Sequence, residues 1–233
     1  MLFTRRAFTL ITMSTRTQIW LAVGFAVLIT AVTIAATVLS KGQEGKDILT
    51  STAPVLTVDD WTQGNAQAKV TVTEYGDFQC PACAKYEPIV QKLIAEYGDR
   101  ILFGFRDFPL YQIHKYASIS ARAAEAAGQQ GKYWEMHDLL YANQTKWSVV
   151  GSETEALNLF KTYAQQIGID PIRFATDVDT AAVHDKINVD VRSANDADVN
   201  STPTFFVNNK KIPNPQSYDE FKSILDAALT PAQ

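Results

Sequence analysis

The sequence predicts an α/β domain whose sheet is interrupted by an all-helical block, preceded by one N-terminal transmembrane helix. Three observations lead to this prediction. A long uncharged apolar run lies near the start of the chain, a strand-helix-strand pattern follows it, and a strand hairpin with a final helix comes after a helical stretch. Of the 233 residues, 46% are hydrophobic and 20% are charged, which is ordinary for a globular protein and excludes a disordered or fibrous one.

The N-terminal segment has the composition of a membrane anchor. Residues 19–39 contain no charged side chain, and as a helix rising about 1.5 Å per residue they are long enough to cross the hydrocarbon core of about 30 Å. Arg5, Arg6 and Arg16 precede this run. The positive-inside rule therefore predicts a cytoplasmic segment at residues 1–18 and a single-pass protein in the cell membrane, with the body of the chain on the extracytoplasmic side.

A cleaved signal peptide is the alternative for this segment. Its apolar region usually has about 7–15 residues and ends at a small-x-small site, which Val38-Leu39-Ser40 matches poorly. Met13 is a second possible start of the chain. We expect an uncleaved helix.

Residues 40–65 are expected to form a mobile polar linker, and residues 66–230 the folded domain. After residue 45 the chain carries 24 acidic and 17 basic residues. An acidic body without a basic stripe argues against nucleic acid as a partner.

The domain begins with a predicted βαβ unit. Residues 69–75 alternate and are rich in β-branched side chains, residues 82–97 follow a helical period that Gly98 ends, and residues 101–105 form a second apolar strand. Two strands joined by one helix most economically form a right-handed unit on a parallel sheet.

The predicted helical insertion covers residues 112–198. Its helices are expected at residues 117–127, 134–141, 153–167 and 182–194, with a short turn at Pro171. Residues 204–212 then form a predicted hairpin, because Asn208-Asn209 suits the positive φ of a tight turn, and residues 218–229 a final amphipathic helix.

Cys80 and Cys83 are the two cysteines of the chain, and their spacing predicts redox chemistry. A Cys-x-x-Cys that opens a helix places its first thiol on the unpaired N–H groups of the first turn, where the positive end of the helix dipole stabilises a thiolate. Cys80 is then the nucleophile. Pro81 suits the first helical position, and Cys83, one turn on, can close a disulfide with Cys80.

Two other interpretations of the pair are open. A structural disulfide closing so short a loop would add little stability. A zinc site needs further ligands, and His114, His137 and His184 show no paired spacing. We expect neither a metal nor a cofactor.

Three motifs in one order give the chain a family resemblance. Residues 74–83 (Glu-Tyr-Gly-Asp-Phe-Gln-Cys-Pro-Ala-Cys), 107–110 (Asp-Phe-Pro-Leu) and 201–207 (Ser-Thr-Pro-Thr-Phe-Phe-Val) resemble the DsbA-like thiol-disulfide oxidoreductases of the thioredoxin superfamily. The resemblance covers about residues 55–230 and implies a thioredoxin fold with an inserted helical domain.

The resemblance also implies roles for single residues. Pro203 falls where the superfamily has a cis-proline facing the Cys-x-x-Cys, and Thr202 would offer its backbone to an extended substrate. Glu74 falls where the family often has a buried acid that exchanges a proton with the second thiol; a surface glutamate on a strand edge is the alternative.

One departure concerns the dipeptide between the cysteines. It is Pro81-Ala82, whereas strongly oxidising members carry Pro-His, so a milder oxidant is expected. Thr202 in place of valine also occurs in isomerase-type and reductase-type relatives, which leaves the direction of electron flow open.

The sequence therefore predicts an extracytoplasmic oxidoreductase that forms disulfides in reduced, unfolded exported proteins and is reoxidised by a quinone-linked membrane thiol oxidase. The alternatives are a reductase or isomerase kept reduced by a membrane electron donor, and a tethered peptide-binding or chaperone module.

Overall fold

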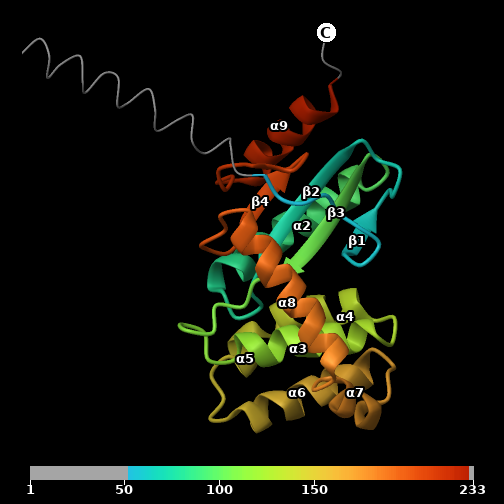
Figure 1. Ribbon diagram of the computed structural model, residues 1–233, viewed down its shortest axis with the longest axis vertical. Helices are drawn as coiled ribbons and strands as arrows, with labels where there is room; N and C mark the ends of the chain where they lie inside the picture. The colour runs from blue at the N-terminus through green and yellow to red at the C-terminus, as the bar shows by residue number, and fades with distance from the viewer. Residues whose placement is uncertain (1–51, 231–233) are drawn as a thin grey trace, which may run out of the picture. The chain divides into compact units, whose positions relative to one another are not determined.

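The computed structural model describes residues 52–230, which form a five-stranded sheet in the order β1-β3-β2-β4-β5, with helices around it and a helical block at one end (Figure 1). The strands are β1 (Trp61–Gly64), β2 (Val70–Gly76), β3 (Ile101–Asp107), β4 (Thr204–Val207) and β5 (Lys210–Lys211). The helices are α2 (Pro81–Tyr97), α3 (Ala117–Gly128), α4 (Tyr133–Ala142), α5 (Gln144–Trp147), α6 (Glu153–Gln166), α7 (Pro171–Asp177), α8 (Ala181–Asp196) and α9 (Tyr218–Leu229).

The predicted cytoplasmic segment 1–18 and membrane helix 19–39 lie outside the described residues. Within residues 52–230, none of the helices is both long and apolar enough to span a bilayer.

The unit of β2, α2 and β3 agrees with the predicted βαβ unit, since β2 and β3 pair in parallel from Val70 with Ile101 to Gly76 with Asp107. The helix α2 starts with Pro81 and ends before Gly98, where a Cβ atom would lie 2.6 Å from a backbone oxygen of the preceding turn. The buried residues of α2 recur at helical spacing, so one stripe of the helix packs on the sheet. They are Cys83, Glu87, Val90, Leu93 and Tyr97.

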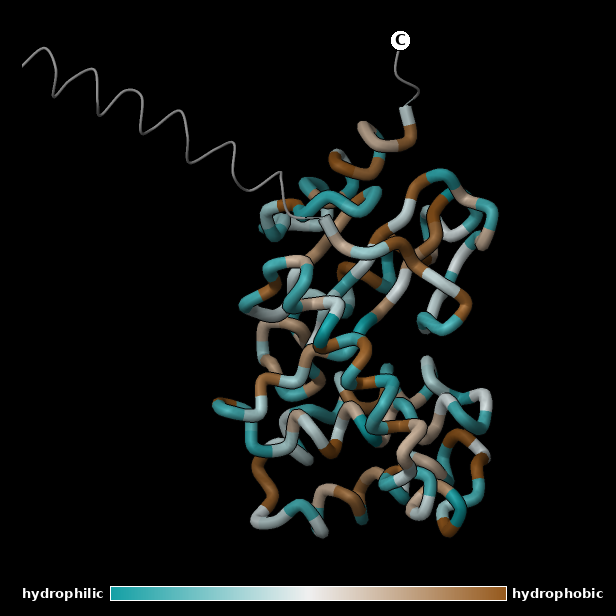
Figure 2. Tube along the Cα trace, viewed as in Figure 1, coloured by the Kyte–Doolittle hydropathy of each residue, from teal (hydrophilic) through white to brown (hydrophobic). Residues whose placement is uncertain are grey.

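The helical block follows the predicted helices closely, except that α5 was not predicted and one predicted turn is wrong. α3, α4, α6 and α8 coincide with predicted helices to within one or two residues at each end. The predicted turn at Pro171 is wrong, because α7 begins there: the Asp170 side chain accepts hydrogen bonds from the N–H groups of Ile172 and Arg173, and proline suits the first helical position. α8 leads back from this block to the sheet and packs against both α3 and β3. Hydrophobic (brown) and hydrophilic (teal) residues alternate along it in Figure 2.

The last part of the domain is the predicted hairpin and helix. β4 pairs antiparallel with β2 and β5, and the turn residues Asn208 and Asn209 have φ of 49° and 65°. α9 has the predicted bounds and packs through Phe221 against Phe205 of β4, with ring centroids 5.0 Å apart.

The predicted linker 40–65 is wrong at its end, because residues 61–64 form β1, antiparallel to β3. Trp61 is the only large apolar residue of this strand. Its ring stacks on Tyr133 at 4.5 Å, and its Nε1–H donates to Glu125 at 2.9 Å. These partners lie far along the chain, so the short polar stretch gives no local strand signal.

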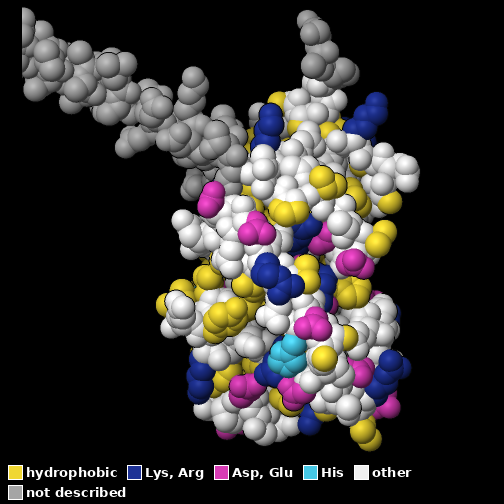
Figure 3. Space-filling view, in the orientation of Figure 1, with side chains coloured by type: hydrophobic (Ala, Val, Ile, Leu, Met, Phe, Trp, Pro, Cys, Tyr) yellow, Lys and Arg dark blue, Asp and Glu magenta, His cyan; other side chains and the backbone are white. Residues whose placement is uncertain are grey.

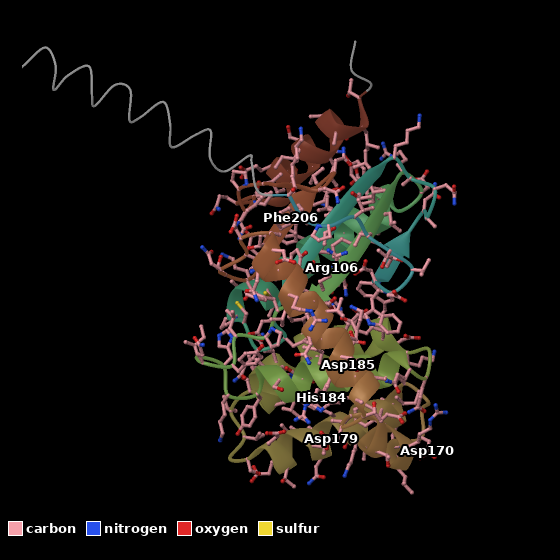
Figure 4. All side chains as sticks on the ribbon, viewed as in Figure 1. Arg106, Asp170, Asp179, His184, Asp185 and Phe206 are labelled. Atoms are coloured by element: carbon pink, nitrogen blue, oxygen red, sulfur yellow. The ribbon has the colours of Figure 1, made fainter. Side chains whose placement is uncertain are left out.

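A buried arginine fixes the segment before β1. Arg106 of β3 donates from Nε and Nη2 to the two carboxylate oxygens of Asp60, at 2.7 and 2.9 Å, and also to the backbone oxygens of Pro54 and Val55. Figure 4 shows Arg106 at the centre of the molecule, where the sheet meets the helical block. Residues 54–60 are therefore part of the folded domain.

Candidate active site

The two cysteines lie where the sequence predicts them, at the start of α2. Cys80 is the residue before the first helical turn, with φ −70° and ψ 120°, and Pro81 occupies the first helical position. Both cysteines are free thiols in the structure. The side chain of Cys80 is 7% exposed and that of Cys83 is 1% exposed, so Cys80 is the more accessible of the two.

The surroundings of Cys80 stabilise its thiolate and lower its pKa to about 5. The largest cause is a hydrogen bond from the Cys83 side chain, which outweighs the opposing effect of burial. The Thr202 side chain and the backbone N–H groups of Cys83 and Ala82 lower the pKa further. The helix terminus therefore supplies donors in place of the histidine that strongly oxidising members carry at the position of Ala82.

Cys83 has the opposite environment. Burial raises its pKa well above the ordinary value of 9.0, and the hydrogen bond to Cys80 and the nearby Glu74 carboxylate raise it further. The pair therefore consists of one acidic thiol near the surface and one buried thiol that holds its proton. Cys80 is therefore the sulfur more open to attack, and its low pKa makes it a good leaving group when a mixed disulfide with a substrate is resolved.

The loop before β4 faces Cys80. The peptide bond between Thr202 and Pro203 is cis, and the Cys80 thiol donates to the backbone oxygen of Thr202 at 3.3 Å. The Thr202 hydroxyl is buried and has no hydrogen-bond partner in the dithiol state, although it lies close enough to lower the pKa of Cys80. A thiolate at Cys80 would accept that hydrogen bond.

Glu74 of β2 is buried, with 2% of its surface exposed, so it is not a surface residue on a strand edge. Burial raises its pKa well above the ordinary value of 4.5, and the negative charges of Glu87 and Cys80 add to the increase. A carboxyl group that retains its proton beside a buried thiol can exchange a proton with it.

Several residues that hold the active-site loop were not predicted. The Nε2 group of Gln144, in α5, donates to the backbone oxygens of Phe78 at 2.7 Å and Cys80 at 2.9 Å. Asp77 accepts from the Gln79 backbone N–H at 2.7 Å and contacts His114 Nδ1 at 2.7 Å. The helical insertion is thus tied directly to the segment that carries Cys80. Asp77 lies in the motif at residues 74–83, whereas no sequence motif marks Gln144 or His114.

The predicted site residues are thereby brought together around one point. Cys80, Cys83 and Pro81 open α2, the Thr202–Pro203 bond lies against Cys80, and Glu74 lies behind Cys83. His184, in α8, lies in the helical block, well away from this site (Figure 4).

Comparison with known proteins agrees with this arrangement. A family model described as thioredoxin matches residues 56–227. The chain belongs to the thioredoxin family. Solved structures place it among the DsbA-like thiol-disulfide oxidoreductases, so the predicted family, the thioredoxin fold with a helical insertion, and the class of enzyme are confirmed.

The DsbA-like chain superposes on oxidised BdbD from Bacillus subtilis with a TM-score of 0.64 and 25% identity, covering 78% of this chain and 98% of that one. For a thioredoxin-like oxidoreductase from Silicibacter pomeroyi the TM-score is 0.63 at 26% identity, with 76% and 95% covered. For α-DsbA1 from Wolbachia pipientis it is 0.65 at 20% identity, with 75% and 93% covered, which shows the shared fold.

The chain is also similar to curated proteins that are named Na⁺/H⁺ antiporters. It is 36% identical over 174 residues to a Na⁺/H⁺ antiporter NhaA of Salinispora tropica, covering 75% of this chain and 25% of the relative. It is 41% identical over 152 residues to one of Salinispora arenicola, covering 65% and 22%. The chain thus spans about a quarter of the length of these relatives.

Proposed function

We propose that the protein oxidises cysteine pairs in exported proteins outside the cytoplasm, through the Cys80–Cys83 couple. The observation that carries this proposal is the asymmetry of the two thiols, in which Cys80 has a pKa of about 5 and Cys83 one well above 9.0. A stabilised Cys80 thiolate favours the dithiol form over the disulfide, so the disulfide is readily passed to a substrate.

The reaction follows from this asymmetry. A substrate thiolate attacks Cys80 Sγ, the Cys80–Cys83 bond breaks, and Cys83 leaves and takes up a proton. A second substrate thiolate then attacks the substrate sulfur of the mixed disulfide, and Cys80 leaves as a thiolate. The substrate is oxidised by two electrons and the enzyme disulfide is reduced by two. Of the two protons lost by the substrate thiols, one ends on Cys83 and one enters the solvent.

The surface near the site supports an unfolded polypeptide as the substrate. A groove of about 430 Å³ is lined by residues 108–113 together with Val191, Asn195 and Asn200. Tyr111 and Ile113 are exposed, and hydrophobic side chains gather on this side of the molecule in Figure 3. Asn200 lies two residues before Thr202, so a segment bound there could pair with the backbone at Thr202 by strand addition.

The extracytoplasmic location rests on the N-terminal sequence. The uncharged run 19–39, with Arg5, Arg6 and Arg16 before it, supports a membrane anchor with the catalytic domain outside. The relatives named as sodium/proton antiporters support a place beside a membrane. Reoxidation of the Cys80–Cys83 dithiol needs an external two-electron oxidant, and we propose a quinone-linked membrane thiol oxidase.

Two measurements test this function. The purified protein is given a reduced, unfolded substrate with two cysteines, and the loss of substrate thiols is followed; Cys80→Ser must abolish it. If Cys80→Ser and the double variant Cys80→Ser/Cys83→Ser retain the activity, a peptide-binding or chaperone module is the better interpretation.

Alkylation of thiols in intact cells gives the direction of electron flow. A Cys80–Cys83 pair that is mostly disulfide supports the oxidase. A pair that is mostly dithiol contradicts it and favours the reductase or isomerase.

A further inference from the structure

Cys83 is a poor leaving group in the proposed reaction. When a substrate thiolate attacks Cys80, the Cys80–Cys83 bond breaks and negative charge develops on the Cys83 sulfur. Burial raises the pKa of Cys83 well above 9.0, and a thiol of high pKa leaves slowly. Cys83 is 1% exposed, so this charge develops away from bulk water. The hydrogen-bond donors that reach the buried sulfur therefore control the rate of this step.

Three tyrosine hydroxyls have no hydrogen-bond partner among residues 52–230, those of Tyr133, Tyr141 and Tyr163. A buried hydroxyl without a partner destabilises a fold, so each of them calls for an explanation. After burial, the largest cause that raises the pKa of Tyr133 is the Asp107 carboxylate, and for Tyr163 burial acts alone. For Tyr141 the largest cause after burial is the charge of Cys83. Tyr141 is therefore the one of the three whose hydroxyl lies near a reacting atom.

The end of β2 fixes the position of the Tyr141 hydroxyl. Gly76 is the last residue of β2, and a Cβ atom on it would lie 3.1 Å from the hydroxyl oxygen of Tyr141 and 2.4 Å from the Phe105 ring. The next backbone N–H, that of Asp77, is close enough to the Cys83 sulfur to lower the pKa of that thiol. The hydroxyl and the sulfur thus lie at the same peptide unit, and a glycine there leaves room for both.

Aromatic side chains hold the Tyr141 ring in place. Its centroid lies 5.0 Å from that of Phe78, 5.0 Å from that of His137 and 6.4 Å from that of Phe105. Phe78 lies two residues before Cys80 in the chain, and α4, which carries Tyr141, packs against α2. A donor held in this way needs no reorganisation when charge appears beside it, which makes it effective in a buried site.

The hydroxyl also retains its own proton. Burial raises the pKa of Tyr141 well above the ordinary 10.0, and the charges of Cys83 and Glu74 raise it further. Glu87 and Asp77 act in the same direction. Tyr141 can therefore donate a hydrogen bond to a thiolate without losing the proton. A neutral Cys83 thiol is only a weak acceptor, which explains why the hydroxyl is unpaired in the dithiol state.

We propose that the Tyr141 hydroxyl donates a hydrogen bond to the Cys83 sulfur as that sulfur leaves, and so speeds the attack of substrates on the Cys80–Cys83 disulfide. The substrate sulfur forms a bond to Cys80 Sγ, the electron pair of the Cys80–Cys83 bond passes to Cys83 Sγ, and Tyr141 keeps its proton. On reoxidation the same hydrogen bond stabilises the attacking Cys83 thiolate. This inference rests on the proposed function, since it concerns one step of that reaction.

The decisive variant is Tyr141→Phe, which removes only the hydroxyl. We expect excess dithiothreitol at pH 7 to reduce the oxidised full-length variant about ten-fold or more slowly than the parent, because one lost donor to a charge that develops in a buried site costs at least that much. The reaction is stopped with acid at successive times, and free thiols are counted by alkylation. The reduction potential should stay at the parental value, since neither the disulfide nor the dithiol contains the hydrogen bond.

A second measurement separates this role from a structural one. In a Cys83→Ala background, Cys80 is converted to its mixed disulfide with glutathione, and the release of glutathione by dithiothreitol is followed. Cys80 is the leaving sulfur in this reaction and Cys83 is absent. Adding Tyr141→Phe to this background should therefore not slow the release, whereas a general disturbance of the active site would slow both reactions.

The matched control is Tyr163→Phe, which removes an unpartnered buried hydroxyl from α6, and we expect its disulfide to be reduced at the parental rate. Both phenylalanine variants should unfold at a urea midpoint no lower than that of the parent, because each removes an unpaired buried group. A lower midpoint for Tyr141→Phe would mean that the hydroxyl has a partner in the dithiol state, and would overturn the proposal.

The outcomes distinguish this inference from the proposed function. If the parent protein does not exchange disulfides at all, the proposed function fails. If the parent is active and Tyr141→Phe is reduced at the parental rate, the role of Tyr141 alone is refuted. Equal slowing of disulfide reduction and of glutathione release likewise refutes it.

Discussion

The unpartnered hydroxyl of Thr202 allows a quantitative prediction about the redox couple. The pKa of Cys80 is about 5 instead of the ordinary 9.0. At pH 7 this difference stabilises the reduced enzyme by about 2.7 kcal/mol, which makes the couple about 60 mV more oxidising than one with an ordinary thiol. One contribution is the Thr202 side chain, which Thr202→Val removes with almost no change of shape.

A hydrogen bond to a charged group contributes about 1.5–3 kcal/mol, so Thr202→Val should raise the pKa of Cys80 to roughly 6 or 7. The reduction potential at pH 7 should then fall by about 30–50 mV, equivalent to a ten- to fifty-fold change in the equilibrium constant with glutathione. The difference should vanish as the pH falls below about 5, where the parental Cys80 also becomes protonated.

Two assays check this prediction: the pH dependence of Cys80 alkylation, and equilibration with glutathione buffers at pH 7 and pH 4.5. Thr204→Val is the matched control, since its hydroxyl donates to the Ser201 backbone oxygen at 2.8 Å and is not among the main causes of the pKa of Cys80. Equal potentials for the parent and Thr202→Val at pH 7 would show that the hydroxyl does not stabilise the thiolate.

Three further predictions concern stability. Gln144→Ala leaves two backbone oxygens at the active-site loop without their donor and should cost about 1–3 kcal/mol, read from the midpoint of urea unfolding. Arg106→Lys cannot pair with both oxygens of Asp60 and should release residues 54–60, seen as faster amide exchange there than in the parent. Burial raises the pKa of Glu125 to about 7 from the ordinary 4.5, so the folded state retains a proton that the unfolded chain loses. The free energy of unfolding should therefore fall by about 3 kcal/mol from pH 4.5 to pH 7, and Glu125→Gln should flatten this dependence in thermal melts across that range.

Local patterns were sufficient for most of the fold. The alternation in β2, the period of α2 and the paired asparagines of the hairpin depend on near neighbours, and each element was predicted to within a few residues. β1 was missed because its pairing with β3 and the stacking of Trp61 on Tyr133 depend on residues 40 to 70 positions away.

The residues of the candidate site also fall into two groups, those that local sequence patterns indicate and those that only distant contacts bring to the site. Cys80, Cys83, Pro203 and Glu74 lie in short motifs, so the sequence alone was enough to propose them, and the structure places them side by side. Gln144 reaches Cys80 across 64 positions of the chain. Such contacts arise only once the helical insertion has packed against α2, and single polar residues inside amphipathic helices give no sign of them.

The anchoring of residues 54–60 by Arg106 limits how far the domain can reach. If residues 19–39 cross the membrane, the tether runs from residue 40 to about residue 52, where the bridge between Thr52 and Lys210 begins the ordered domain. Thirteen extended residues span at most about 45 Å, half of the roughly 90 Å that a free linker to residue 65 would allow. On that condition, a partner in the membrane could meet Cys80 and Cys83 only within this shorter reach, and shortening residues 40–52 should slow reoxidation more than lengthening them.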